Sequence, residues 1–158
     1  MDIAWRRAQP EDVPEIERMY TPAEREQVSL REAWGIADGL AEPHSETLSS
    51  IIADEEESFL AVGTIDGVTF GFTWAHLADL LPQAAGERIG VIRMIYVDEE
   101  ARAVGVGEVM LAGVMEWFAS KDVQRFDAIV SPGHRLAKNF FESAGFKARR
   151  ITMYRRDE

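Results

Sequence analysis

The chain has 158 residues, no cysteine and a formal net charge of −11. This length fits a single domain, residues 1–158, whose folding can bury roughly 70% of the unfolded surface, and the lack of cysteine excludes disulfides, thiolate catalysis and Cys-ligated metals. The acidic charge argues against sequence-independent binding to nucleic acid and favours cationic partners.

The first third of the chain is predicted to form an edge strand followed by three helices. Residues 3–8 alternate as a strand does, and Pro10 with acidic neighbours starts a helix that runs through Tyr20. Apolar residues at helical spacing predict a second helix between Pro22 and Leu40 and a third over residues 46–53.

A hairpin is predicted next. Two alternating apolar runs, residues 59–65 and 68–74, flank Asp66-Gly67, and Asp-Gly between such runs is a strong signal for a two-residue hairpin turn. Residues 77–87 are predicted to form a loop that leads into the next strand.

The most informative stretch combines a strand, a glycine turn and a helix. Residues 91–97 are rich in β-branched and aromatic residues, the turn spans Arg102 to Gly107, and residues 106–120 have helical spacing. The first amides of a helix lack intrahelical partners and lie at the positive end of its dipole. The turn is therefore suited to bind an anion, and phosphate is the natural candidate.

This turn has three possible interpretations: a dinucleotide fingerprint, a P-loop, or a connection that binds no ligand. A dinucleotide fingerprint needs a third glycine where Met110 stands, and a P-loop needs Lys-Ser/Thr where Glu108-Val109 follow the last glycine. The third reading, a glycine-rich connection with no ligand, stays open on this motif alone.

The second half of the chain repeats the strand-to-helix order. Residues 126–131 are predicted to form a strand, Pro132-Gly133 ends it, and residues 134–144 form a short helix. Two further strands, 146–148 and 151–155, are predicted to close the sheet. Since no run has the length of a signal peptide core or a membrane span, we expect a soluble, cytoplasmic protein.

Two motifs in this half resemble the GNAT superfamily of acyl-CoA N-acyltransferases. The family's diphosphate signature, (Arg or Gln)-x-x-Gly-x-(Gly or Ala), is similar to Arg102, Gly105 and Gly107. Its later pattern, Asn-x-x-Ala-x-x-x-Tyr-Glu-x-x-Gly-Phe, is met by Ala137, Glu142, Gly145 and Phe146, with His134 in the Asn place and Phe141 in the Tyr place. The resemblance is specific over residues 91–146.

The resemblance implies an α/β (α+β) fold with a mixed, mostly antiparallel sheet of six or seven strands flanked by helices. It also implies acetyl-CoA as co-substrate, no metal, and a bulge that splays the 91–97 strand from the 126–131 strand. The cofactor-binding residues that it implies are Ile95, Tyr96, Val97, Arg102, Ala103, Val104, Gly105, Val106, Gly107, Glu108, His134 and Phe141.

The implied reaction is direct attack of a primary amine, on a small molecule or on a protein or peptide, upon the thioester. The family's usual carboxylate positions carry Val91 and Ile129, and Phe141 has no proton for the leaving thiolate. The remaining candidates for proton transfer are Tyr154, His76 and His134.

The departures from the family pattern at Val91, Ile129 and Phe141 keep a second hypothesis open, a catalytically silent acyl-CoA-binding or regulatory module. Family members often pair through sheet edges or helices, which suggests a homodimer.

Overall fold

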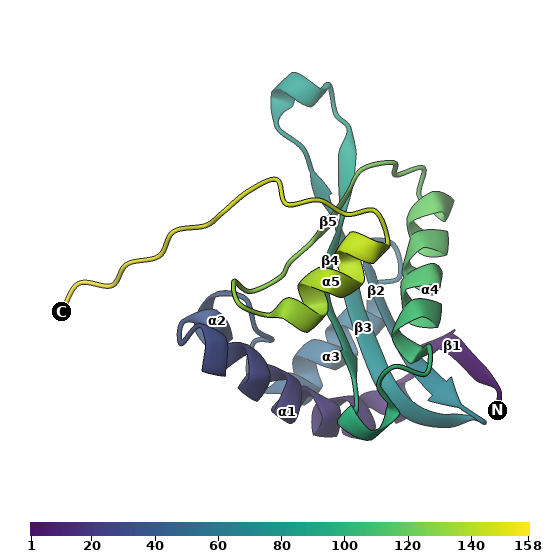
Figure 1. The fold of residues 1–158 in the computed structure, drawn as a ribbon. Coiled ribbons are helices and arrows are strands. Elements are labelled where there is room, and N and C mark those ends of the chain that lie inside the picture. Colours follow the sequence, from purple (N-terminus) through teal and green to yellow (C-terminus); the bar gives the residue numbers. More distant parts are fainter.

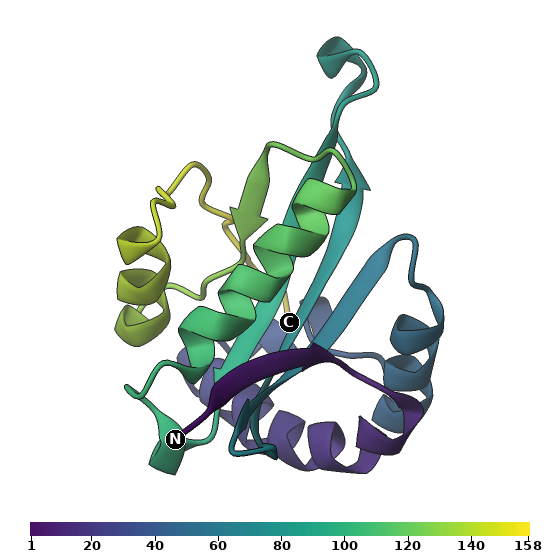
Figure 2. The same cartoon turned by 90° about the vertical axis from the view of Figure 1, so that its right-hand side faces the viewer.

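The computed structural model describes residues 1–158 as one five-stranded sheet with helices on both faces (Figures 1 and 2). The strands are β1 (Ile3–Arg7), β2 (Ser58–Ile65), β3 (Val68–Asp79), β4 (Arg88–Val97) and β5 (Phe126–Ala128), in the spatial order β1-β2-β3-β4-β5. The first four strands pair antiparallel, and β5 joins β4 in parallel. The sheet is therefore mixed and mostly antiparallel.

Five α-helices and three short 3₁₀ turns connect the strands. The α-helices are α1 (Val13–Leu30), α2 (Trp34–Ala37), α3 (His44–Ala53), α4 (Val106–Ser120) and α5 (Arg135–Ser143), and the 3₁₀ turns are η1 (Pro10–Asp12), η2 (Pro82–Ala84) and η3 (Glu99–Ala101). Helices α1 and α3 lie on one face of the sheet, and α4 lies on the other (Figure 2). The predicted hairpin is confirmed, with Asp66 and Gly67 between β2 and β3.

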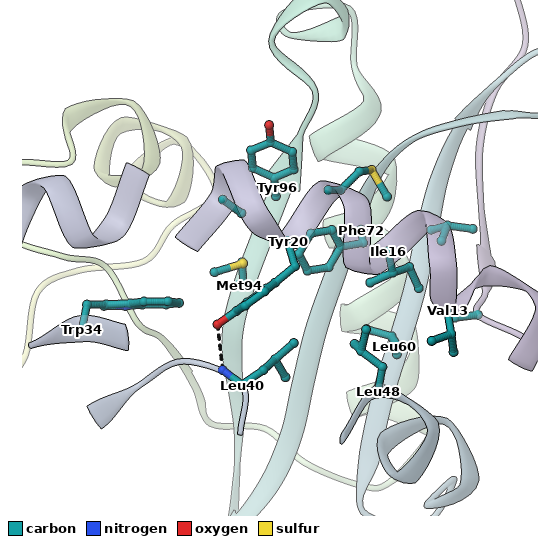
Figure 3. Close-up of a cluster of buried hydrophobic side chains, with 14 residues drawn as sticks. Val13, Ile16, Tyr20, Trp34, Leu40, Leu48, Leu60, Phe72, Met94 and Tyr96 are labelled. Carbon is teal, nitrogen blue, oxygen red and sulfur yellow. Dashed lines mark hydrogen bonds between the residues drawn. The ribbon is translucent and has the colours of Figure 1, made fainter. Parts of the chain in front are cut away.

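Two buried clusters hold the helices to the sheet, one on each face. The first packs α1, α2 and α3 against β2, β3 and β4 (Figure 3). At its centre Tyr20 is fully buried, and its hydroxyl accepts a 2.8 Å hydrogen bond from the backbone N–H of Leu40. Burial raises the pKa of this hydroxyl well above its ordinary value, so Tyr20 stays neutral. Trp34 belongs to the same cluster, so this residue is part of the core.

The second cluster packs α4 and α5 on the opposite face. Phe118 of α4 is fully buried and stacks on Phe126 of β5, with ring centroids 5.3 Å apart. Phe141 of α5 is buried in the same cluster, beside Phe140 and Phe146. The position of β5 is therefore set largely by aromatic packing, because its ladder to β4 is only three residue pairs long.

Two sequence predictions about these elements were wrong. The break predicted before Pro22 is absent: α1 continues through Pro22 to Leu30. Proline removes one helical hydrogen bond, but apolar residues on both sides of it, Met19, Tyr20 and Ala23, are buried and keep the helix continuous.

The number of strands was also overestimated. The sheet has five strands rather than six or seven, because residues 146–148 and 151–155 pair with no other strand. Residues 147–158 are exposed and run away from the sheet (Figure 1). A β-strand is defined by its ladder of backbone hydrogen bonds, and within this chain the ladder for these residues does not form.

Candidate active site at the opening between β4 and β5

Strands β4 and β5 separate half-way along β4. Their pairing runs from Gly90 opposite Phe126 to Ile92 opposite Ala128, and the N–H of Ile129 donates one more bond to the carbonyl of Ile92 at 3.0 Å. Beyond that point β4 continues to Val97 with no partner on this side. The two strands therefore leave an opening that exposes backbone groups of β4.

A bulge in β4 lies where this opening begins, as the family resemblance predicts. Trp74 of β3 pairs with Met94 and the next residue pairs with Ile92, so Arg93 is the extra residue. The Oγ1 of Thr73 on β3 donates to the carbonyl of Met94 at 3.0 Å. Since backbone groups alternate in direction along a strand, those of Ile95 and Val97 face the opening.

The glycine turn after β4 ends at the same opening. Ala103 and Gly105 have φ values of 65° and 105°, and α4 begins directly after them at Val106. The first helical bond at this end joins the N–H of Val109 to the carbonyl of Gly105. The amides of the preceding residues, 106–108, therefore have no intrahelical acceptor and can bind an anion.

Gly107 lies within this amide cradle, residues 106–108, and lets the first turn of α4 approach α5 closely. A Cβ atom there would lie 3.2 Å from Cε2 of Phe140 on α5 and 3.9 Å from Cγ2 of Val97 on β4. The residue thus faces the space between the first turn of α4, α5 and the end of β4. The unpaired amides of this cradle can therefore bind an anion such as a diphosphate.

The Arg102 side chain turns away from that cradle and toward α1. Its Nε donates to the carbonyl of Val97 at 2.8 Å, and its terminal NH₂ donates to Glu26 at 2.7 Å. The guanidinium lies 5.4 Å from the centre of the Tyr96 ring. Arg102 therefore ties the β4–α4 loop to α1, so any charge that it supplies to a phosphate acts at longer range than the amides do.

Helix α1 also contacts the other side of the opening. The hydroxyl of Ser131, in the loop between β5 and α5, donates to Oε1 of Gln27 at 2.6 Å. Glu26 and Gln27 are neighbours on α1, and together they hold the loops that follow β4 and β5. The sequence carried no signal for these contacts, because each joins residues more than 70 positions apart.

His134 caps α5 on the β5 side of the opening. Its Nδ1 atom is buried and has no hydrogen-bond partner, although buried polar atoms are nearly always paired. Burial lowers the pKa of the imidazole below its ordinary value, a shift that Arg102 reinforces and Glu26 opposes. His134 is therefore a neutral imidazole at pH 7 whose buried Nδ1 lacks a protein partner.

A sequence model of the acetyltransferase (GNAT) family matches residues 11–146. The chain belongs to this family. No curated protein matches it. Its fold is similar to that of a tetramutant of the BH1408 protein from Bacillus halodurans, with a TM-score of 0.80, 22% identity and 99% of both chains covered.

Two further structures extend the comparison. A putative acetyltransferase from Agrobacterium tumefaciens has a TM-score of 0.74 and 17% identity over 98% of this chain and 99% of that one. AAC(6')-Iy in complex with the bisubstrate analogue CoA-S-monomethyl-acetylneamine has a TM-score of 0.70 and 18% identity over 99% of both chains. At these identities the likeness concerns the fold of this GNAT domain.

Of the three proton-transfer candidates in this GNAT domain, the structure brings only His134 to the opening. His76 lies in β3 opposite Val91, below the point where the strands part, with its Nδ1 3.1 Å from the carbonyl of Leu77. Tyr154 is 64% exposed in the segment outside the sheet.

None of the helices combines the length and the apolar character that a membrane span requires.

The depressed pKa of His134 predicts a pH dependence. Because the folded state holds this proton less tightly than the unfolded state, stability falls as pH drops from about 6.5 toward the folded pKa. Two-dimensional NMR of the imidazole should give a titration midpoint below 6.5, and His134→Gln should flatten the pH dependence of urea unfolding in this window. A midpoint above 6.5 would contradict the expected burial.

Proposed function

We propose that the protein transfers an acetyl group from acetyl-CoA to a primary amine by direct attack on the thioester. The observation that carries the proposal is the coincidence, at one opening, of unpaired β4 backbone and unpaired α4 amides. Membership of the acetyltransferase family supports it. The neighbouring AAC(6')-Iy complex, which contains a CoA bisubstrate analogue, supports CoA as the acyl carrier.

Each part of the site has a task in this proposal. The diphosphate binds the amides of residues 103–108. The amide-bearing pantetheine arm pairs, as a further strand would, with the backbone groups of Ile95 and the N–H of Val97, whose carbonyl already accepts from Arg102. His134, at the start of α5, supplies a hydrogen bond to the arm through its imidazole ring. Phe141 contributes only apolar packing beneath the site, since it is buried among aromatic side chains.

The chemistry joins the amine nitrogen to the thioester carbon, breaks the carbon–sulfur bond and releases one proton. A lysine-like amine has a pKa near 10.4, so making it neutral at pH 7 costs about 4–5 kcal/mol unless the site assists. The CoA thiolate, with a pKa near 8.5, can leave without an acid. We therefore propose that the amine loses its proton to ordered water, because Val91 and Ile129 occupy the family's usual carboxylate positions.

The proposed acceptor is a cationic amine. The chain carries a net charge of −11, which attracts cations at long range.

A thiol-release assay tests the proposal. The purified protein is supplied with acetyl-CoA and a panel of polyamines, aminoglycosides, amino acids and lysine or N-terminal peptides. We expect saturable release of free CoA that depends on one class of amine. Tight CoA binding with no release for any amine would overturn the enzymatic proposal and support the silent acyl-CoA-binding module, which the absence of a hydroxyl on Phe141 favours.

A further inference from the structure

The segment that follows β5, residues 130–146, is joined to the other elements by a single hydrogen bond. Ile129 makes the last backbone bond to β4, and beyond it the backbone bonds only within the segment. The one ion pair of the segment lies inside α5. The bond from Ser131 to Gln27 of α1 is therefore the only hydrogen bond or ion pair that fixes this segment to the rest of the chain.

This bond lies where it controls the start of α5. The hydroxyl of Ser131 donates to Oε1 of Gln27 at 2.6 Å. Ser131 is only 7% exposed, and a buried polar group that loses its partner is costly. The backbone N–H of His134 donates in turn to the carbonyl of Ser131 at 3.0 Å. A shift of Ser131 would therefore carry His134 and the first turn of α5 with it.

Helix α5 itself is held by apolar packing. Phe141 is buried in the second cluster, with Phe140 and Phe146 packed against it. Apolar attraction has no preferred direction, whereas a hydrogen bond fixes both a distance and an angle. The packing therefore keeps α5 close to the sheet, and the bond to Gln27 sets where it lies. Because a Cβ atom on Gly107 would lie 3.2 Å from Phe140, a shift of α5 also changes the amide cradle.

Helix α1 is a rigid support for this bond. Three of its side chains have no exposed surface and pack in the first cluster. The residue before Gln27, Glu26, binds Arg102, whose Nε donates to the carbonyl of Val97 at the end of β4. Two consecutive residues of one helix thus hold the loops after β4 and β5, and the helical rise of about 1.5 Å per residue fixes their spacing.

We propose that Gln27 is a positioning residue for CoA. Through Ser131 it holds the β5–α5 loop and α5 at the separation from β4 that lets the pantetheine arm lie between the two strands. Without the bond, the segment keeps its apolar packing but samples a wider range of separations, and only a fraction of the molecules then fit CoA. The inference rests on the proposed binding of CoA at the opening, and it is independent of whether acetyl transfer follows.

Isothermal titration with CoA tests Gln27→Ala and Ser131→Ala, each of which removes one partner of the bond. We expect the affinity for CoA to fall roughly five- to tenfold in either variant, the size of one hydrogen bond. The double variant should be no weaker than either single variant, because the bond is already lost. Ser131→Thr keeps the hydroxyl and should restore most of the affinity. Ser29→Ala, which removes a hydroxyl that bonds only within α1, is the matched control and should leave the affinity unchanged.

Hydrogen exchange and urea unfolding separate positioning from a merely structural role. In Gln27→Ala we expect faster exchange over residues 131–143 in the free protein and renewed protection when CoA binds. A contact that serves stability alone would lower the urea midpoint but leave the CoA affinity of the folded variant unchanged, and that result would overturn the proposal. If Ser131→Ala does not fold, Gln27→Ala decides the matter alone, because Gln27 is only half-buried. Failure of the original protein to bind CoA would overturn the proposed function as well, which distinguishes the two failures.

Discussion

Gly107→Asp should weaken CoA binding by on the order of 100-fold in a folded protein. The new carboxylate would lie in the cradle formed by the first turn of α4, Phe140 and Val97. Two unit charges about 6 Å apart interact by about 3 kcal/mol at an effective dielectric constant near 20, and about 1.4 kcal/mol corresponds to a tenfold change in affinity. Isothermal titration with CoA gives the measurement directly.

Gly107→Asn is the matched control for this experiment. Its side chain has nearly the same size and shape but no charge, so it measures the cost of volume beside Phe140 alone. We expect Asn to weaken CoA binding clearly less than Asp does, and the difference between the two should shrink at high salt. Equal affinities of the Asp variant and the original protein would mean that no diphosphate binds at this turn.

Phe118→Ala should lower the free energy of unfolding by about 3–5 kcal/mol, the usual range for a fully buried phenylalanine. Phe118 has no exposed surface, and it stacks on Phe126 at the start of β5. For a chain of this size the loss corresponds to roughly 10 °C in Tm. Because Phe126 helps to fix β5, hydrogen exchange in β5 should also increase.

Glu116→Ala, on the exposed side of the same helix, is the control for Phe118→Ala. It removes no buried contact and should change stability by less than about 0.5 kcal/mol. Urea unfolding followed by tryptophan fluorescence measures both variants. A loss below 1 kcal/mol for Phe118→Ala would show that α4 does not pack on β5 through this ring.

The sequence predicted those elements whose signals are local. Asp66-Gly67 predicted the hairpin turn between β2 and β3. The change from alternating apolar residues to helical spacing predicted the boundary between β4 and α4. The break predicted at Pro22 is absent because the burial of residues on both sides outweighs the local cost of proline, which no local rule measures. The strands predicted at 146–148 and 151–155 have the right alternation, but a ladder also needs a partner strand.

At the site, too, the local features were predictable and the contacts between distant residues were not. The glycine turn after Arg102, where we propose that the diphosphate binds, is a local pattern, and its helix begins where predicted, at Val106. The role of the Arg102 side chain was not predictable, since its partner Glu26 lies 76 residues earlier in the chain. His134 was selected by its place in a motif, but only the structure reveals its buried, unpaired nitrogen.

The single extra residue in β4 has a consequence for how this chain tolerates genetic change. Ile92 packs on the α4 face, whereas Met94 packs on the α1 face, because Arg93 shifts the phase of the strand between them. Replacing Arg93 leaves that phase intact. Losing its codon would make Ile92 and Met94 consecutive, opposite Ala75 and Trp74 in a regular ladder, with each side chain still on its present face. We therefore expect an in-frame deletion here to preserve the packing of the sheet while removing the bulge at the opening.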